Sequence, residues 1–373
     1  MTPMWIAGIV SVGLALVAGW GVPALGMRAL MPALERSRMR VVNYRGREVT
    51  PGLGLVWVLW AVGVWTVTVV ADGLDSVLAM TGTLQPAVYP DVLREAAWLV
   101  PVLLVTAAFA FGLIDDAFGG ADTKGFRGHI DALRHGRLTT GGLKMLGIGL
   151  ASLAVCVEPA LRRAFDAAGG ISQPRTVAFV VLAGWLLGAA VIALAANLIN
   201  LTDLRPGRAL KCYSLLAVGA VAAALPWALG SAAIAEEQVP SGVAPAPQAI
   251  LVAVVLVILL LGPVVAVWRY DLSERGMLGD AGANAAGALA GFVLAATLPL
   301  WGLAVAATLL LALNLLSEKI SFSESIEKVP LLRWLDGLGR VRDGSDVAAG
   351  SDAGGENGTA ATADTGGTDG EAR

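Results

Sequence analysis

The chain has 373 residues, of which 56% are apolar and only 15% charged, and it carries a formal net charge of −3 with a pI of about 5.5. Soluble domains contain about 25% charged residues, so this composition excludes an ordinary soluble globule, a disordered chain and a nucleic-acid-binding protein. The composition is instead typical of an integral membrane protein, for which the lipid bilayer is a partner.

Stretches without Asp, Glu, Lys or Arg mark the predicted membrane-spanning helices, because a span needs about 20 apolar residues. The first four lie at residues 1–27, 49–71, 96–114 and between Lys144 and Glu158. The fourth has only 13 uncharged residues, so it needs its flanks to cross the membrane. The next three lie at residues 176–202, 212–235 and within 238–268.

The last uncharged stretch, residues 281–317, is too long for a single span. Its 37 residues would measure about 55 Å as one helix. Pro299 and Gly302 stand near its middle, so we expect two helices joined by a tight turn. The total is then about nine transmembrane helices, and the predicted fold class is an all-α, polytopic integral membrane protein.

The distribution of Lys and Arg predicts the orientation. With the N-terminus outside, the inner segments hold 22 of these residues and the outer loops hold four. Because positive charge gathers on the cytoplasmic side of membrane proteins, we expect an outside N-terminus, a cytoplasmic C-terminus and a multi-pass location in the plasma membrane. No Lys or Arg precedes the first helix, which argues against a cleaved signal peptide.

The composition divides the chain into a membrane-embedded domain, residues 1–340, and a cytoplasmic tail, residues 341–373. From Asp343 onward the tail has no aromatic residue, Leu or Ile, so it is predicted to be disordered. The tail from that residue has a net charge of −6, which leaves +3 for the rest of the chain. The membrane domain therefore presents a basic cytoplasmic face, suited to anionic partners.

Two adjacent carboxylates, Asp115 and Asp116, follow the third predicted span. Carboxylates are unfavourable beside hydrocarbon and at the C-terminal end of a helix. They also repel each other unless a cation lies between them. The pair is either a solvated helix stop or part of a functional site on the cytoplasmic side.

The fifth predicted span ends in a polar stripe formed by Asn197, Asn200 and Asp203. Their spacing of three places them on roughly one helix face. Such a stripe must face protein or a water-filled cavity rather than lipid. It serves either interhelical hydrogen bonding or a ligand site.

Asp280 follows the seventh span and precedes an apolar helix, with glycines on both sides. It is either a plain helix N-cap or a metal-binding carboxylate beside a helix N-terminus, which favours phosphate.

Together, these segments bring carboxylates to one membrane face, where the inner loops also hold basic residues. Mg²⁺ in proteins binds one or two carboxylates together with substrate phosphate, and Lys and Arg neutralise phosphate charge. The constellation therefore predicts phosphoryl chemistry at the inner membrane surface. The basic residues are Lys124, Arg127, Arg134, Arg137, Arg205, Arg208 and Lys211.

The order of these motifs resembles the polyprenyl-phosphate N-acetylhexosamine-1-phosphate transferase family, which includes the phospho-N-acetylmuramoyl-pentapeptide transferases and the undecaprenyl-phosphate GlcNAc-1-phosphate transferases. The resemblance covers roughly residues 43–340. It rests on five segments: Asn43-Tyr44-Arg45-Gly46-Arg47 with Pro51-Gly52-Leu53-Gly54, Gly112 to Asp116, Thr123-Lys124-Gly125, Asn197 to Asp203, and Met277 to Asn284.

The resemblance implies a Mg²⁺-dependent reaction in which a polyprenyl (undecaprenyl) phosphate attacks the sugar-linked phosphate of a nucleotide-sugar, typically a UDP-sugar. The products would be a polyprenyl-diphosphate-sugar and UMP, for cell-envelope polysaccharide or peptidoglycan-type biosynthesis. On this resemblance Asp115, Asp116, Asp203 and Lys124 are catalytic, and Asp280, Asp115 and Asp203 are metal ligands. The implied substrate-binding residues are Asn197, Asn200, Arg205, Arg208, Asn43 and Arg47.

The chain departs from the family in the regions that recognise the donor. Pro206 stands where the family has a second Asp, residues 318–340 contain no His, and a tenth span is lacking. Arg205 and Arg208 replace an Asp and a Leu of the family, which suggests a more anionic or different donor. The donor sugar and a homodimeric state stay open.

Two other functions compete with the transferase. A non-catalytic relative could bind lipid phosphate or organise a cell-envelope assembly, and it differs from the enzyme only in lacking metal-dependent turnover. A secondary transporter would keep its coupling residues near the bilayer midplane, often in repeated halves. The carboxylates here lie at one face and the sequence shows no repeat, which disfavours transport.

Overall fold

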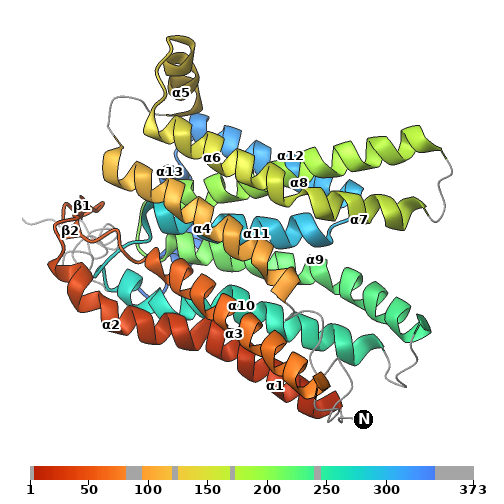
Figure 1. Cartoon of the computed structure of the whole chain (residues 1–373). Helices are drawn as coiled ribbons and strands as arrows, with labels where there is room; N and C mark the ends of the chain where they lie inside the picture. The colour runs from red at the N-terminus through yellow and green to blue at the C-terminus, as the bar shows by residue number, and fades with distance from the viewer. Residues whose placement is uncertain (1–3, 81–94, 120–124, 169–172, 239–244, 341–373) are drawn as a thin grey trace, which may run out of the picture. The chain divides into compact units, whose positions relative to one another are not determined.

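The computed structural model describes residues 4–80, 95–119, 125–168, 173–238 and 245–340 (Figure 1). The N-terminal half contains α1 (Met4–Leu16), a π-helical segment η1 (Val17–Gly21), α2 (Val22–Arg36), β1 (Val41–Val42), β2 (Glu48–Val49), α3 (Leu55–Met80), α4 (Glu95–Phe118), α5 (Gly125–Arg134), α6 (Thr140–Val155) and α7 (Val157–Ala168). The C-terminal half contains α8 (Pro174–Thr202), α9 (Arg208–Gln238), α10 (Pro245–Leu272), α11 (Gly279–Thr297), α12 (Leu300–Lys319), α13 (Phe322–Lys328) and α14 (Pro330–Gly337).

The described residues include eight helical segments that are long and apolar enough to cross a membrane, consistent with an all-α polytopic membrane protein. The first segment, Gly8–Arg36, continues past the predicted end at Met27 to the end of α2 and so includes the basic residues Arg28 and Arg36. The fourth, Thr140–Phe165, joins α6 to α7, so the weak central stretch does gain its length from its flanks. The eighth predicted span corresponds to α11, which is not among these eight segments, whereas the ninth corresponds to α12, which is.

The long stretch near the C-terminus breaks where the sequence predicted. Helix α11 ends at Thr297 and α12 begins at Leu300, after the extended residues Leu298 and Pro299. Pro299 lacks a backbone N–H and restricts the residue before it, which ends the first helix. The prediction of two helices joined by a tight turn is therefore confirmed.

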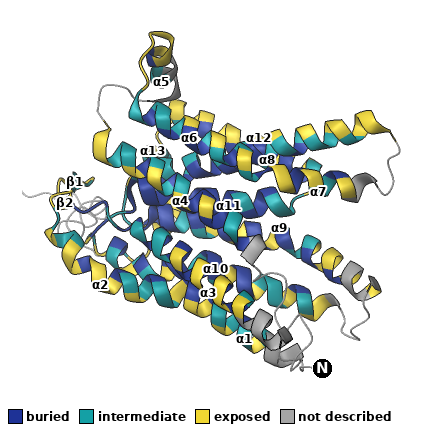
Figure 2. Cartoon of the chain, viewed as in Figure 1, coloured by how far each residue is buried: buried dark blue, intermediate teal, exposed yellow. Residues whose placement is uncertain are grey.

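Helix α11 forms the centre of the bundle, packed against α4, α8 and α9 (Figure 2). Fifteen of its 19 residues are buried, and most of these are Ala or Gly. Small residues let helix backbones approach closely. Where α4 approaches α11, a Cβ atom added to Gly112 would lie 2.5 Å from the Ala281 Cα, so only glycine fits there.

A short antiparallel ribbon stands out from the helices at the end of the bundle where α4 and α8 end. Val41 of β1 pairs with Val49 of β2, and Val42 pairs with Glu48. The segment after β2 is fixed to the loop before α11, because the Met277 N–H donates to the Thr50 carbonyl at 2.9 Å. The first loop and the last motif of the sequence are thereby brought together.

Candidate active site

The N-terminus of α11 is capped by a side chain from another helix. Asp116 of α4 accepts hydrogen bonds from the Asp280 and Ala281 backbone N–H groups, each at 2.9 Å. The first N–H groups of a helix have no partner within it, and a carboxylate there is favourable. Gly279 just before has a φ of 68°, a conformation that glycine adopts without strain. Asp116 therefore fixes where Asp280 lies.

A lysine lies between the carboxylates of Asp115 and Asp280. The Lys144 Nζ of α6 is 2.6 Å from Asp115 Oδ2 and also forms an ion pair with Asp280 Oδ2. With its amide nitrogen toward Asp280, Asn200 of α8 donates to Asp280 Oδ1 at 2.8 Å, and its oxygen is 3.3 Å from Lys144. The ammonium thus neutralises part of the charge that Asp115 and Asp280 concentrate there.

Asp203 joins the same helix terminus from α8. Its Oδ2 accepts a hydrogen bond from the Gly279 N–H at 2.9 Å. Burial raises the pKa of Asp203 well above its ordinary value, as do the carboxylates of Asp271 and Asp280, while the Gly279 hydrogen bond opposes this rise. The side chain therefore lies in a region where negative charge is already concentrated.

The four predicted carboxylates thus meet around the first residues of α11, although they belong to α4, to the end of α8 and to α11 itself. We call this region the carboxylate end of the bundle; it comprises Asp115, Asp116, Asp203 and Asp280 together with Lys144 and Asn200. The other five residues are all more than 60 residues away from Asp280 along the chain. A site of this kind favours cations and, through them, phosphate.

Mg²⁺ is bound by oxygen ligands, and the carboxylate end of the bundle supplies these. Among the described residues, no group of three or more His, Cys, Asp or Glu side chains is arranged to hold a metal ion. Mg²⁺ in phosphate sites needs only one or two carboxylates beside the substrate phosphates, however. Asp115 and Asp280 meet this requirement, since both already contact one cation, the Lys144 ammonium. These two residues fit a Mg²⁺, whereas Asp203 uses one oxygen on Gly279.

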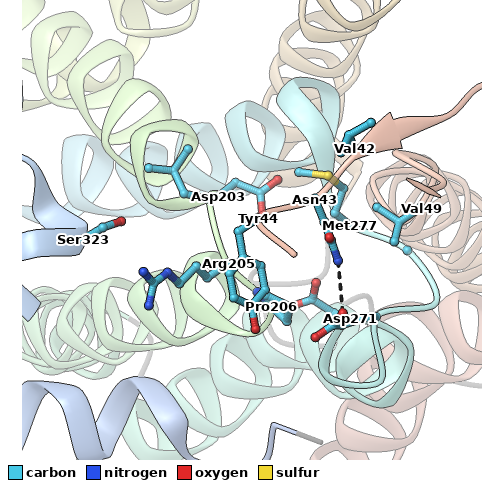
Figure 3. Close-up of a pocket in the computed structure, with 13 residues that line it drawn as sticks. Val42, Asn43, Tyr44, Val49, Asp203, Arg205, Pro206, Asp271, Met277 and Ser323 are labelled. Atoms are coloured by element: carbon cyan, nitrogen blue, oxygen red, sulfur yellow. Dashed lines mark hydrogen bonds between the residues drawn. The ribbon is translucent and has the colours of Figure 1, made fainter. Parts of the chain in front are cut away.

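A cavity of about 430 Å³ adjoins Asp203 (Figure 3). Its wall includes Asn43 and Tyr44 from the β1–β2 turn, and Arg205 and Pro206 from the loop after α8. The remaining lining residues are Val42, Val49, Leu204, Asp271, Glu274, Gly276, Met277 and Ser323. The cavity is therefore built from the first loop, the end of α8 and the loop before α11.

Asn43 organises the turn that covers this cavity. Its Oδ1 accepts from the Arg45 and Arg47 N–H groups at 2.9 and 3.0 Å, and its Nδ2 donates to Glu274 Oε2 at 3.0 Å (Figure 3). Arg45 and Arg47 also form ion pairs with Glu274 at 3.4 and 3.7 Å. Asn43 and Arg47 therefore hold the cavity wall, and Glu274 links them to the loop before α11.

The two arginines predicted to bind the donor differ in their surroundings. Arg205 lines the cavity, where its guanidinium lies 5.4 Å from the Tyr44 ring centroid and pairs with Glu327. Arg208 is buried, and its guanidinium donates to both Asp336 oxygens at 2.9 and 3.0 Å. Of the two, Arg205 is placed to meet a ligand in the cavity.

Two other predicted residues are not part of the carboxylate end: Asn197 lies away from it, and Lys124 is not among the described residues. Asn197 donates to Asn314 Oδ1 of α12 at 2.6 Å, which is the interhelical hydrogen bond that the sequence left open as an alternative. Lys124 lies outside the described residues, as does the tail from residue 341.

Sequence reasoning missed three residues of this region, namely Lys144, Glu274 and Asp271. Lys144 was noted only as the boundary of the fourth span, yet a lysine within a membrane helix is unfavourable without a partner, and this was a usable signal. Asp271 accepts from the Gly207 N–H at 2.7 Å and holds the loop after α8. Nothing in the local sequence distinguishes Asp271 or Glu274 from ordinary loop acids.

Because Lys144 forms ion pairs with both Asp115 and Asp280, its replacement is expected to affect stability. We expect Lys144→Met to lower the free energy of unfolding by about 2 kcal/mol, because Asp115 and Asp280 lose their cation while the Asp280 side chain, 34% exposed, is partly screened by water. Added Mg²⁺ should raise the melting temperature of this variant more than that of the wild type. Thermal unfolding in detergent measures both effects.

The matched control is the double variant Lys144→Met/Asp280→Asn, which retains only one of the two carboxylates. We expect its melting temperature to respond to Mg²⁺ no more than that of the wild type. An equal Mg²⁺ response in all three proteins would show that Asp115 and Asp280 do not form a cation site.

Comparison of the chain with protein-family models gives no match, and comparison with curated proteins gives no match either. The function is therefore argued from the residues and their geometry.

Proposed function

We propose that this protein transfers a sugar 1-phosphate from a nucleotide-sugar to a polyprenyl phosphate at the cytoplasmic face of the plasma membrane, with Mg²⁺ as cofactor. The observation that carries the proposal is the convergence of Asp115, Asp116, Asp203 and Asp280 at one end of a membrane bundle, beside a cavity of about 430 Å³. The resemblance of the motifs to polyprenyl-phosphate sugar-1-phosphate transferases supports the same reaction.

In the proposed reaction an oxygen of the lipid phosphate attacks the sugar-linked phosphorus of the donor. The bond between this phosphorus and the bridging oxygen of the diphosphate breaks, and the nucleoside monophosphate leaves with that oxygen. Such transfers depend chiefly on positioning the reactants and neutralising their charge. A bound Mg²⁺ would supply charge neutralisation of the phosphates.

The chain's own residues have separate parts in this scheme. Both carboxylate oxygens of Asp116 accept hydrogen bonds from the N-terminus of α11. Asp116 therefore positions Asp280 and does not itself bind the ligand. Asp115 and Asp280 would hold the metal, which frees the Lys144 ammonium to pair with phosphate. Arg205 and Tyr44 would bind the donor in the cavity.

The test uses purified full-length protein in nanodiscs with undecaprenyl phosphate, Mg²⁺ and a panel of nucleotide-sugars. We expect release of UMP, or of another nucleoside monophosphate, with at least one donor. The release should require both the lipid phosphate and Mg²⁺, so reactions without lipid and with EDTA are the controls. No release with any donor would overturn the proposal.

A second candidate function is binding of lipid phosphate without turnover, in a scaffold for envelope assembly. The observation that favours this function is that two basic residues expected near the substrate phosphates already form ion pairs within the protein. Lys144 pairs with Asp115 and Asp280, and Arg208 pairs with Asp336. Saturable binding of undecaprenyl phosphate by a protein that releases no nucleotide with any donor would support this second function.

A further inference from the structure

Helix α14, at the C-terminal end of the described chain, carries an apolar stripe that the described residues leave uncovered. Leu331, Trp334 and Leu335 follow the spacing i, i+3, i+4 of a single helix face, and the apolar Leu338 comes directly after the helix. Their exposed fractions are 63%, 59%, 41% and 41%. A stripe of this size on a short helix needs an apolar surface to cover it.

The opposite face of α14 is attached to the first turn of α9. Asp336 is buried and pairs with Arg208. Lys211, one turn further along α9, donates to the Leu335 and Asp336 carbonyls at 2.9 and 2.7 Å. Because residues one turn apart on α9 both reach it, α14 lies alongside the start of this helix rather than beyond its end.

The position of α14 along α9 fixes its depth relative to the bilayer. Helix α9 begins a candidate membrane span at Arg208. On the face of α9 that includes Lys211, the next residues at helical spacing are Leu215 and Val218, which are 75% and 54% exposed. Such large exposed apolar residues on a membrane helix face lipid. Helix α14 therefore lies at the edge of a lipid-facing surface.

The chain around α14 carries exposed charges of both signs beside the apolar face. The preceding span, α12, ends at Lys319, and Lys319, Lys328 and Arg333 are exposed, as are Glu318, Glu324 and Glu327. Basic residues beside an apolar helix face attract anionic lipid headgroups, and Trp is enriched at the membrane–water boundary.

We infer that α14 is an interfacial helix, which lies in the headgroup region of the membrane leaflet on the carboxylate side. Leu331, Trp334 and Leu335 contact the acyl chains there. Arg208 and Lys211 connect this helix to the start of α9, directly after the loop of Arg205 and Pro206 that lines the cavity. The lipid surface thereby supports one wall of the cavity.

The test places a nitroxide spin label on each face of α14 in the full-length protein. Cys156 and Cys212 are first replaced by alanine. The label is then introduced through Leu335→Cys or Leu331→Cys on the apolar face, and through Arg333→Cys on the opposite face as the matched control. Collision rates with molecular oxygen and with a water-soluble nickel chelate are measured in nanodiscs of phosphatidylethanolamine and phosphatidylglycerol.

We expect the labels at residues 331 and 335 to collide severalfold more often with oxygen than with nickel, and the label at residue 333 to show the reverse. Equal nickel accessibility on both faces would place α14 in water and overturn the inference. Protection of residues 331 and 335 from both reagents would also overturn it, since the stripe would then be covered by protein, such as a second copy of the chain. The outcome does not depend on turnover, so it is separate from the proposed function.

Discussion

Asp280→Asn is expected to lower the release of nucleoside monophosphate at least about 100-fold, the usual effect of removing one electrostatic group from a phosphoryl- or acyl-transfer site. Asp280 is the carboxylate that contacts both Lys144 and Asn200. The substitution should leave the fold intact, since Asp116 binds the backbone N–H of residue 280, which asparagine retains, and Lys144 keeps Asp115 as its partner. Turnover and thermal unfolding are measured on the same preparation.

The matched control is Asp131→Asn on α5, which removes a carboxylate whose side chain is 73% exposed. This variant should keep both turnover and melting temperature, because an exposed charge contributes little. If Asp280→Asn folds normally and retains turnover close to that of the wild type, Asp280 is not at the reacting centre, and the assignment of the carboxylate end as the active site is wrong.

Arg208→Met is expected to have the largest effect on stability, a loss of about 3 kcal/mol or more, because removing one partner of a buried ion pair leaves a buried charge. Arg208 and Asp336 have side chains that are only 3% and 8% exposed. Arg208 also donates to the Ser323 hydroxyl at 2.8 Å, so the variant loosens both α13 and α14. SDS-induced unfolding and the rate of proteolysis within residues 320–340 measure the effect.

The double variant Arg208→Met/Asp336→Leu removes both charges and should recover most of the lost stability. Arg205→Ala is the control, because it removes a nearby arginine whose partner, Glu327, is 51% exposed. It should lower the free energy of unfolding by about 1 kcal/mol or less. If Arg208→Met is as stable as the wild type, the pair with Asp336 does not hold the C-terminal helices.

The same variants separate the two arginines in donor recognition. Arg205 lines the cavity, so Arg205→Ala should weaken donor binding while stability is kept. Because Arg208 is buried against Asp336, the double variant should bind the donor as the wild type does. Loss of donor binding in the double variant would instead restore the prediction from the sequence, in which both arginines contact the donor.

The spans could be predicted because hydropathy is a local property of the chain. The length of an apolar stretch decides whether it crosses a bilayer, and a proline within it ends a helix, so the break at Pro299 was readable directly. The short ribbon of β1 and β2 was not expected in an all-α chain. It is a local hairpin, in which Val41 pairs with Val49, and only its attachment to the loop before α11, through Thr50 and Met277, joins residues far apart in the sequence.

The candidate site could be predicted in part. The carboxylates were found because a charge at the end of an apolar helix is unfavourable and needs an explanation. The residues that contact these carboxylates were not predicted, because each contact joins two different helices and depends on how those helices pack. Spacing placed Asn197 and Asn200 on one face of α8, yet Asn197 bonds to Asn314 of α12, whereas Asn200 faces Asp280.

The sequence by itself determined which segments are apolar enough to span a membrane and which residues bring carboxylates to their ends. Only the tertiary structure decided that Lys144 lies between Asp115 and Asp280, that Asp116 caps α11, and that Arg208 is occupied by Asp336. The physical reason is that burial follows from local composition, whereas the partner of each polar group depends on how closely the helices pack. In this bundle, that packing is set by the small residues of α11.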